Sequence, residues 1–431
     1  MKKIFVFLLF MMLVLSGVVT AQSVVHPSIG DSVRSADGTF AITLVSKKQY
    51  YSKAVEDTAT LDRDIWSPKS VNIHPDGQKY YVNSLEGART VVYETGTNKK
   101  LAVINHRFTE ADSALWSKPS GLFPFTHYTD SLDFFSGKPV ESVFSHGGRY
   151  LWVPYYRRSY DINAQDPSAV AIIDTQTDKI VRLMETGPLP KMIAVSRDNR
   201  LVAITHWGNN TVGIIEITSD SPADWHYVSC VTVGRKLKLD FSLEEPVDRD
   251  NNSGLCLRGT VFTPDSRYLL VGCMGGSGGI AVIDVDSASY LGTLHGMMSN
   301  LRHLVIRNGF LYLSINKGGY IQRIPMNLFY EAVSNMENKR GVLEGWTNCK
   351  VGSGARTIAI TPNGRFVLAA CNFSNCLTIV NAFTMKEVAT IPADSYPVGL
   401  DISKDGRYVY TTSQGRSGEG GNCIDIYRMT Y

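Results

Sequence analysis

One repeated unit constrains the fold of this chain more than any other feature of its sequence. Residues 355–391, ARTIAITPNGRFVLAACNFSNCLTIVNAFTMKEVATI, alternate four short apolar runs with polar turns, the first of which is Pro362 to Gly364. Apolar runs of this length separated by turn residues predict a four-stranded antiparallel meander. A single meander cannot bury both of its faces, so further copies must pack against it.

The chain contains seven copies of this unit. The first turns of the copies align at Asp76, Gly147, Asp198, Asp265, Asn308, Asn363 and Asp405. The shortest spacings are 42 residues (363 to 405) and 43 residues (265 to 308), the length of a four-stranded propeller blade. Insertions lengthen the other spacings; they lie near 105–137, 154–168, 219–257 and 325–345. The copies predict an all-β fold, a seven-bladed β-propeller.

The last copy, residues 398–429, ends after its third strand. An apolar run at residues 40–45 (FAITLV) has no partner nearby in the sequence. We therefore expect this N-terminal strand to complete the last blade, which closes the ring and removes open sheet edges. A sandwich or solenoid built from the same strands leaves the seven copies and the missing strand unexplained.

The first 21 residues resemble a targeting signal. Lys2 and Lys3 precede an apolar run from Ile4 to Leu15, and small residues follow up to Ala21. This pattern predicts a cleaved signal peptide over residues 1–21, with 22–431 as a single exported propeller domain, periplasmic or secreted. The alternative is a retained anchor, for which the apolar run is short. No cysteine follows Gly17 to accept a lipid.

The repeats also resemble a known family. The order of apolar strand, Ser/Thr-Pro-Asp/Asn-Gly, strand and Asn-Thr-Val-x-x-Ile-Asp is similar to that of the YVTN-repeat propellers, which include the YncE-like exported bacterial proteins. NNTVGIIEI (209–217), IAVIDVDSASYLGTL (280–294) and SAVAIIDTQTDKIVRL (168–183) carry this resemblance. It implies a seven-bladed propeller and a ligand-binding or scaffolding role. The large insertions and the degenerate fifth copy depart from the family pattern.

Basic residues recur at one equivalent position of the repeats. The position two residues before the apolar core of each first strand holds a cation in five copies and valine (Val140 and Val398) in two; the cations are Lys69, Lys191, Arg258, Arg302 and Arg356. The net charge of +3 is too small to argue by itself for nucleic-acid or membrane binding. Equivalent positions of a propeller form a ring around its axis, so these cations should converge at one mouth and repel one another. An anionic ligand would offset that repulsion; alternatively, the cations pair with neighbouring acidic groups or face water.

The ends of the second strands should lie on the same face. Candidate ligand-binding residues there are Arg157, Arg158, His206, Trp207, Asn372 and Phe373. Aromatic rings beside cations suit stacking on bases or sugars, with the charge on phosphate or sulfate. Trp207 and Phe373 could instead simply cover sheet edges. The aromatic-rich insertion at 105–137 is expected to overhang this mouth as a partial lid.

Signals for catalysis and metal binding are sparse. The chain has no H-E-x-x-H and no C-x-x-C motif. His206 and His303 are the weak candidates for a catalytic acid and base. No cysteine spacing matches a zinc site, so neither a metal nor a cofactor is expected. Cys371 and Cys376 flank one hairpin and could face each other, and Cys230 and Cys256 bracket one insertion.

The sequence therefore predicts an exported, monomeric ligand-binding or scaffolding propeller without a membrane span. Its expected ligand is anionic and binds at the mouth of the ring; the candidates are a glycan, a nucleic acid and an acidic protein partner. Two alternatives stay open: an enzyme, lactonase or lyase, acting on a sugar-acid-like substrate, and a pure scaffold for protein–protein interaction.

Overall fold

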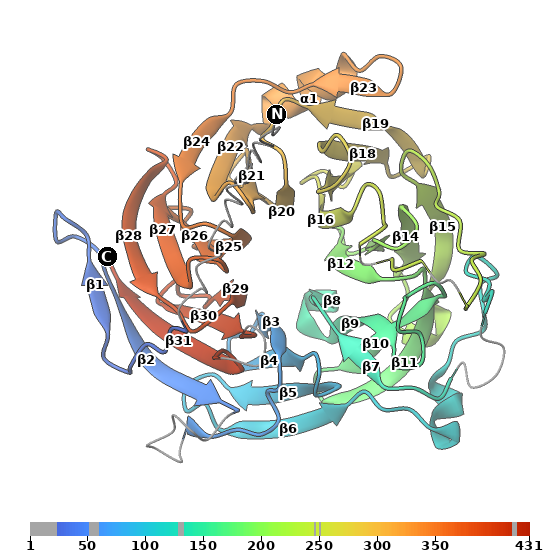
Figure 1. Cartoon of the computed structure of the whole chain (residues 1–431), viewed down its shortest axis with the longest axis horizontal. Helices are drawn as coiled ribbons and strands as arrows, with labels where there is room; N and C mark the ends of the chain where they lie inside the picture. Colours follow the sequence, from blue (N-terminus) through green and yellow to red (C-terminus); the bar gives the residue numbers. More distant parts are fainter. Residues whose placement is uncertain (1–23, 51–59, 128–132, 245–246, 250, 416–419) are drawn as a thin grey trace, which may run out of the picture.

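Seven antiparallel sheets form a ring around a central axis (Figure 1). The computed structural model describes residues 24–50, 60–127, 133–244, 247–249, 251–415 and 420–431. Each sheet is one blade, and its first strand lies nearest the axis. The predicted seven-bladed β-propeller is confirmed.

The first four blades follow the chain in order. Blade 1 contains β3 (Pro68–Ile73), β4 (Lys79–Ser84), β5 (Arg89–Glu94) and β6 (Lys100–Asn105). In blade 2, two short inner strands pair with β9 in place of one; its strands are β7 (Gly137–Pro139), β8 (Val143–Ser145), β9 (Tyr150–Arg158), β10 (Ser168–Asp174) and β11 (Lys179–Thr186). Blade 3 contains β12 (Pro190–Val195), β13 (Leu201–His206), β14 (Thr211–Glu216) and β15 (His226–Thr232). Blade 4 contains β16 (Leu257–Phe262), β17 (Tyr268–Cys273), β18 (Ile280–Asp284), β19 (Ser289–His295) and the added edge strand β23 (Arg340–Val342).

The last three blades include the ring closure. Blade 5 contains β20 (Leu301–Arg307), β21 (Phe310–Ile315), β22 (Tyr320–Pro325) and β24 (Thr347–Lys350). The helix α1 (Met326–Ser334) lies in the insertion after β22. Blade 6 contains β25 (Ala355–Ile360), β26 (Phe366–Cys371), β27 (Cys376–Asn381) and β28 (Lys386–Pro392). Blade 7 contains β29 (Pro397–Ile402), β30 (Tyr408–Ser413), β31 (Cys423–Thr430), β2 (Ala41–Gln49) and β1 (Ser32–Arg34).

Short irregular helices occupy three of the connections. They are η2 (Glu110–Leu115) in the first insertion, η3 (His146–Gly148) in the first turn of blade 2, and η4 (Pro222–Asp224) before the outer strand of blade 3. None of them belongs to a blade sheet, so the propeller itself is built from strands.

A repeated side-chain device shapes the first hairpin of the blades. In blade 6, the Thr361 hydroxyl donates to Asn363 Oδ1 at 2.7 Å and accepts the backbone N–H of Phe366 at 3.0 Å. Gly364 then takes a φ of +72°, which favours glycine. In blade 7 the Ser403 hydroxyl makes the equivalent bond to the Asp405 carboxylate, at 2.5 Å. The Ser/Thr-x-Asp/Asn element of the sequence is therefore scaffold.

The N-terminal strand closes the ring as predicted. The strand β2 pairs antiparallel with β31, and it is longer than the apolar run at 40–45. A bulge between Leu44 and Ser46 changes which residues face the neighbouring blade, so that Lys47 and Gln49 are buried beyond it. The closure therefore contains a buried cation as well as an apolar contact.

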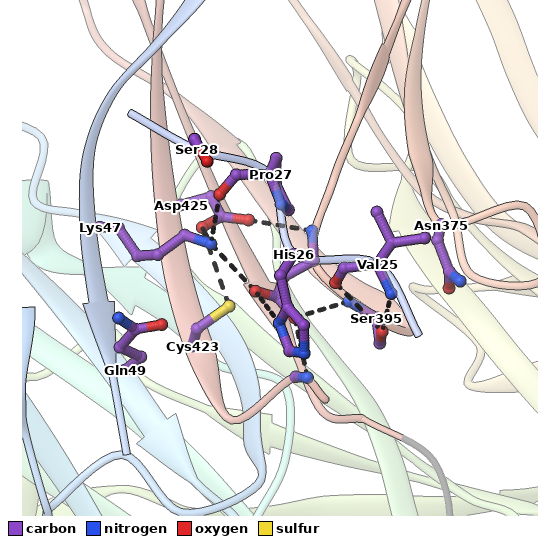
Figure 2. A network of polar contacts seen from close by, with 12 residues as sticks. Val25, His26, Pro27, Ser28, Lys47, Gln49, Asn375, Ser395, Cys423 and Asp425 are labelled. Carbon is purple, nitrogen blue, oxygen red and sulfur yellow. Dashed lines mark hydrogen bonds and ion pairs between the residues drawn. The ribbon is translucent and has the colours of Figure 1, made fainter. Parts of the chain in front are cut away.

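Lys47 lies at the centre of a buried polar network between blades 6 and 7 (Figure 2). Its Nζ lies 3.0 Å from Asp394 Oδ2 and 3.5 Å from Asp425 Oδ1, and it donates to the Pro27 carbonyl at 2.9 Å. The Val25 N–H donates to Ser395 Oγ at 2.8 Å. The network thus ties residues 25–27 and strand β2 to the rest of the ring.

The predicted signal peptide, residues 1–21, lies outside the described residues, the first of which is Val24. Among the residues described, no helix is both long and apolar enough to cross a lipid bilayer. All seven cysteines are free thiols. Cys371 and Cys376 do lie directly opposite each other across β26 and β27.

Candidate functional site

The five candidate cations occupy one structural position. The innermost strands β3, β12, β16, β20 and β25 each contain a register shift near their start, and the pairing skips Lys69, Lys191, Arg258, Arg302 and Arg356. A bulged residue leaves the regular strand ladder, so its side chain is re-aimed. Val398 holds the same place in β29. Because the bulge lies at the same place in each of these strands, aligning the repeats was enough to locate the five residues.

Hydrogen bonds between adjacent blades fix these bulges. The Ser314 hydroxyl of blade 5 donates to the Arg356 carbonyl of blade 6 at 2.6 Å. Thr357 of blade 6 bonds the Val398 carbonyl of blade 7 in the same way, also at 2.6 Å. At these two interfaces, a hydroxyl of one blade therefore holds the backbone at the bulge of the next blade.

These cations are largely withdrawn from water. Lys69, Lys191 and Arg356 are each 6% exposed, and Arg258 is 7% exposed. Burial, followed by the charge of Arg258, lowers the pKa of Arg302. Burial also lowers the pKa of Arg356, against the effect of a hydrogen bond to Tyr396. The inner strands thus carry several poorly solvated positive charges that are close enough to act on one another.

Glu141 is the carboxylate that the repeat alignment missed. Its Oε1 lies 3.7 Å from Lys69 Nζ, and its side chain is 16% exposed. Burial raises the pKa of Glu141 to about 7, while the charges of Arg258 and Arg302 act in the opposite direction. Glu141 lies at the break between β7 and β8 and follows Val140, which holds the cation position in the second copy. An acidic residue next to that position was the signal in the sequence that could have identified Glu141.

Aromatic side chains contact the cations of blades 3 and 4. Lys191 Nζ lies 3.7 Å from the ring centroid of Tyr156 and 5.0 Å from that of Trp207. The guanidinium carbon of Arg258 lies 5.3 Å from the Trp207 centroid. Trp207 is 8% exposed, and its Nε1 donates to the Arg249 carbonyl at 3.1 Å. The structure therefore brings Trp207 together with two of the predicted cations.

A second polar group lies between blades 6 and 7. Tyr396, which the sequence did not single out, is hydrogen-bonded to Arg356, and its ring lies 6.4 Å from that of Phe373. Asn372 is 1% exposed, and its Oδ1 has no hydrogen-bond partner among the described residues. A Cβ on Gly354 would meet this oxygen at 2.1 Å, so the local packing requires glycine. These residues extend the candidate site from Arg356 outward.

The two arginines at the end of β9 lie in different environments. Arg157 is half-buried, its guanidinium lies 5.2 Å from the Tyr156 centroid, and its charge acts on Lys191. Arg158 is 2% exposed and packs against Trp116, Phe125 and Phe135, with centroid distances of 4.9, 5.0 and 4.7 Å. Adjacent residues of a strand point to opposite faces, so the two side chains separate.

The insertion at 105–137 forms the packing around Arg158. Trp116 bridges to Leu183 on β11, the outer strand of blade 2, and Phe123 packs edge-on against Tyr227 of the outer strand of blade 3. These contacts hold the insertion against the outer edges of blades 2 and 3, whereas the sequence indicated a lid over the mouth. Arg158 is therefore assigned to this packing and not to the ring of cations.

Replacing Arg158 with alanine should loosen the insertion without affecting ligand binding at the mouth. The change removes three cation–ring contacts, each worth up to about 2 kcal/mol when desolvated, so we expect a loss of about 2–4 kcal/mol in stability. Limited proteolysis should cut within 105–137 faster, and sulfate affinity should stay within about two-fold of wild type. A parallel loss of sulfate affinity would instead place Arg158 in the site.

The two candidate catalytic histidines are neutral; His206 is buried and His303 is half-buried. Burial lowers the pKa of His206 to about 3 and that of His303 to about 4. His206 Nδ1 lies 2.8 Å from Thr211 Oγ1, and its ring packs edge-on against Phe123. His303 Nδ1 accepts the Ile358 N–H at 3.2 Å. These contacts of the two histidines are structural, and each ring titrates well below neutral pH.

Two other features of the structure could in principle form a functional site. The run Gly275–Gly279 satisfies the pattern G-x-S-x-G, but it forms the hairpin between β17 and β18 and not the strand-to-helix turn that presents a nucleophilic serine. A cavity of about 470 Å³ opens at the opposite end of the inner strands, lined partly by Asn98, Lys404 and Tyr410. Its lining comes from the hairpin turns of the scaffold, so the cation ring remains the candidate site.

Comparison with known proteins shows the fold alone. No protein-family model and no curated protein matches the chain. Among solved structures, the chain is similar to a structure of Kuenenia stuttgartiensis hydrazine synthase, with a TM-score of 0.59 and 13% sequence identity. The match covers 88% of this chain and 99% of the other chain. It is also similar to a chain of the mitotic checkpoint complex (TM-score 0.57, 13% identity, covering 90% and 94%). The β-propeller domain of Cps50 (Swd1) from Myceliophteria thermophila gives a TM-score of 0.57 at 12% identity, covering 84% and 96%. These similarities establish a WD40-like seven-bladed propeller, and the finer resemblance to YVTN-repeat proteins stays a prediction.

Proposed function

We propose that this propeller binds an anionic ligand at the mouth formed by Lys69, Lys191, Arg258, Arg302 and Arg356. One observation carries the proposal: five cations occupy equivalent bulges, and four of them are 6–7% exposed. Gathering poorly hydrated like charges costs free energy, and a bound anion would offset that cost.

The charge balance at the mouth favours an anion. Within the described part of the chain, Glu141 is the carboxylate found in an ion pair with one of these five cations, Lys69. Its proton affinity is high for a glutamate, because burial opposes its ionisation. A partly protonated carboxylate offsets only part of the charge of its partner Lys69. Phosphate and sulfate groups match the arginine geometry, and Tyr156 and Trp207 offer ring faces to a sugar or base.

The expected ligand is therefore a phosphorylated or sulfated molecule, such as a glycan or a single-stranded nucleic acid. Isothermal titration with a sulfated oligosaccharide should show saturable binding. Its affinity should fall roughly 50-fold between about 50 mM and about 200 mM NaCl if three or four anionic groups are bound. Binding that is indifferent to salt would contradict the proposal.

A protein partner is the second candidate. The similar propellers include a chain of an assembly, the mitotic checkpoint complex, and propellers commonly serve as scaffolds. An acidic segment of a partner would satisfy the same cations. Competition separates the two cases: a sulfated oligosaccharide should displace an acidic partner that binds at the mouth, and it should not displace a partner that binds the outer blade surfaces.

We also propose that the protein is exported. This part of the proposal rests on the signal-like residues 1–21 alone. A monomeric state is also part of the proposal. An N-terminal sequence of the secreted protein that begins near Gln22 would support export, whereas a retained Met1 in a cytosolic fraction would contradict it.

Replacing Glu141 with glutamine should strengthen anion binding at pH 8 and flatten its pH dependence. The pKa of Glu141 is raised to about 7, so the wild-type carboxylate is charged at pH 8 and mostly protonated at pH 6. Affinity of the wild type for sulfate should therefore rise as the pH falls through 7. Removing one negative charge at this range is worth about 1 kcal/mol after screening, or about five-fold in affinity.

The comparison of the two proteins isolates Glu141 from other titrating groups. The Glu141→Gln variant should bind sulfate about five-fold more tightly than wild type at pH 8, and the two should converge at pH 6. The pKa of His303, about 4, lies below this range. Equal affinities at pH 8 would show that Glu141 does not act on the bound anion.

A further inference from the structure

We propose that Lys191 is a nucleophilic amine that captures anionic carbonyl compounds at the mouth as a reversible imine. The inference deepens the anion-binding function proposed above and rests on it. It names the ligand class as small phosphorylated or carboxylated aldehydes and ketones, and it assigns the five cations unequal roles.

Lys191 lies in an unusually dry and aromatic environment for a lysine. It occupies the bulge of β12 and is 6% exposed. Its Nζ lies 3.7 Å from the Tyr156 centroid and 5.0 Å from the Trp207 centroid, so two rings replace much of its water. Loss of hydration disfavours the ammonium relative to the neutral amine.

The charged groups around Lys191 act mainly in the same direction. Burial, then the guanidiniums of Arg258, Arg302 and Arg157, lower the pKa of Lys191 well below its ordinary value, and the Cys256 thiol opposes them. A desolvated lysine beside other cations is a recognised form of activated nucleophile. The two rings attract an ammonium, and each of them can raise the pKa by up to about one and a half pH units. Burial and three guanidiniums together outweigh that attraction.

Lys69 provides the contrast within the same ring of cations. It occupies the equivalent bulge of β3 and is also 6% exposed. Its Nζ lies 3.7 Å from the Glu141 carboxylate, and such an ion pair favours the ammonium. Two lysines of equal burial at equivalent positions thus have opposite electrostatic environments, and Lys191 alone is the expected nucleophile of this pair.

The chemistry requires no further reactant. The lone pair of neutral Nζ attacks the carbonyl carbon, the carbonyl oxygen takes up a proton, and a carbinolamine forms. Loss of one water then gives the C=N bond of the imine, and the two nitrogen protons leave with that water and the solvent. Arg258 and Arg302 would hold the phosphate or carboxylate of the same molecule, which places its carbonyl beside Lys191.

Reductive trapping with two matched aldehydes tests the inference. The full-length protein is treated with pyridoxal 5′-phosphate or with pyridoxal, reduced with borohydride and mapped by peptide mass spectrometry. At pH 7.5, we expect Lys191 to be labelled at least about ten-fold faster than Lys69, and the phosphorylated aldehyde to react about ten-fold faster than pyridoxal. Labelling of Lys191 should reach half its maximal rate at a lower pH than that of Lys69.

Three variants complete the test. Lys191→Arg keeps a cation and should abolish the adduct, because a guanidinium forms no imine here. Cys256→Ser should still give the adduct on Lys191, which excludes capture by the neighbouring thiol. Arg258→Gln should shift the labelling profile of Lys191 to higher pH, a change that a purely structural role of Arg258 would not produce.

The outcomes separate the inference from the proposed function. If wild type binds sulfate but neither aldehyde labels Lys191 faster than Lys69, the inference is overturned and anion binding stands. If pyridoxal labels Lys191 selectively, but the phosphate gives no gain and sulfate does not bind, the anion site is wrong and the reactive lysine stands.

Discussion

Lys47→Ala should destabilise the protein by about 3–5 kcal/mol. Lys47 Nζ contacts Asp394 at 3.0 Å and Asp425 at 3.5 Å, and both carboxylates are fully buried. Removing the ammonium leaves two buried carboxylates without their cation. Because the same side chain also holds Pro27 and anchors β2, the closing strand should detach first.

The pH dependence of this loss distinguishes electrostatics from packing. Burial already raises the pKa of Asp425 to about 6 with Lys47 present. Without Lys47, the folded carboxylates should take up protons at a higher pH than the unfolded ones, so the folded state binds more protons between about pH 4 and pH 7. The stability of Lys47→Ala should therefore fall as the pH rises, and its deficit against wild type should be smaller at pH 5 than at pH 8.

Urea unfolding of wild type and three variants measures the loss of stability. Lys48→Ala, a half-buried lysine of the same strand on its other side, is the matched control and should cost less than about 1 kcal/mol. Lys47→Met combined with Asp394→Asn and Asp425→Asn removes all three charges and should recover most of the loss. Equal losses for Lys47→Ala and Lys48→Ala would show that the buried network does not hold the closure.

Replacing Arg258 and Arg302 together with glutamine should weaken sulfate binding about 100-fold or more. Each charge-assisted hydrogen bond to an anion contributes about 1.5–3 kcal/mol, and the two arginines occupy bulges of adjacent blades. The same change relieves repulsion between the two guanidiniums, since each lowers the proton affinity of its neighbours. The protein should therefore lose affinity without losing stability.

A double variant with the same loss of charge controls for long-range electrostatics. Arg407 and Arg428 are exposed residues of blade 7, and Arg407→Gln with Arg428→Gln should change sulfate affinity by less than about two-fold. Calorimetric titration of the two double variants and wild type at one ionic strength gives the comparison. Equal weakening in both would mean that net charge, and not the mouth, determines binding.

Repetition made the fold predictable from the sequence. The turn residues recur because blades 3, 4, 6 and 7 use the same bond from a Ser or Thr hydroxyl to an Asp or Asn side chain, as Ser403 and Asp405 show. The missing outer strand of the last blade indicated the role of the run at 40–45. The buried network of Lys47 was not predicted, because the bulge after Leu44 alters the alternation of the strand and brings together residues almost 350 positions apart.

The candidate site was predictable only where it follows the repeat. The five cations share a bulge, so aligning the copies located all of them. Glu141 escaped because the inner strand of blade 2 is broken between β7 and β8. The environment of Arg158 depends on the insertion at 105–137, which has no counterpart in the other blades. Tertiary contacts of unique segments leave no periodic signal in the sequence.

Crystals soaked in sodium selenate test the central claim most directly. Selenate has the charge and shape of sulfate, and its anomalous scattering locates the anion without bias. We expect a peak within hydrogen-bond distance of the guanidiniums of Arg258 and Arg302, and its loss in the Arg258→Gln, Arg302→Gln double variant. Selenate bound only on the outer blade surfaces, at a concentration that saturates the protein in solution, would contradict an anion site at the mouth.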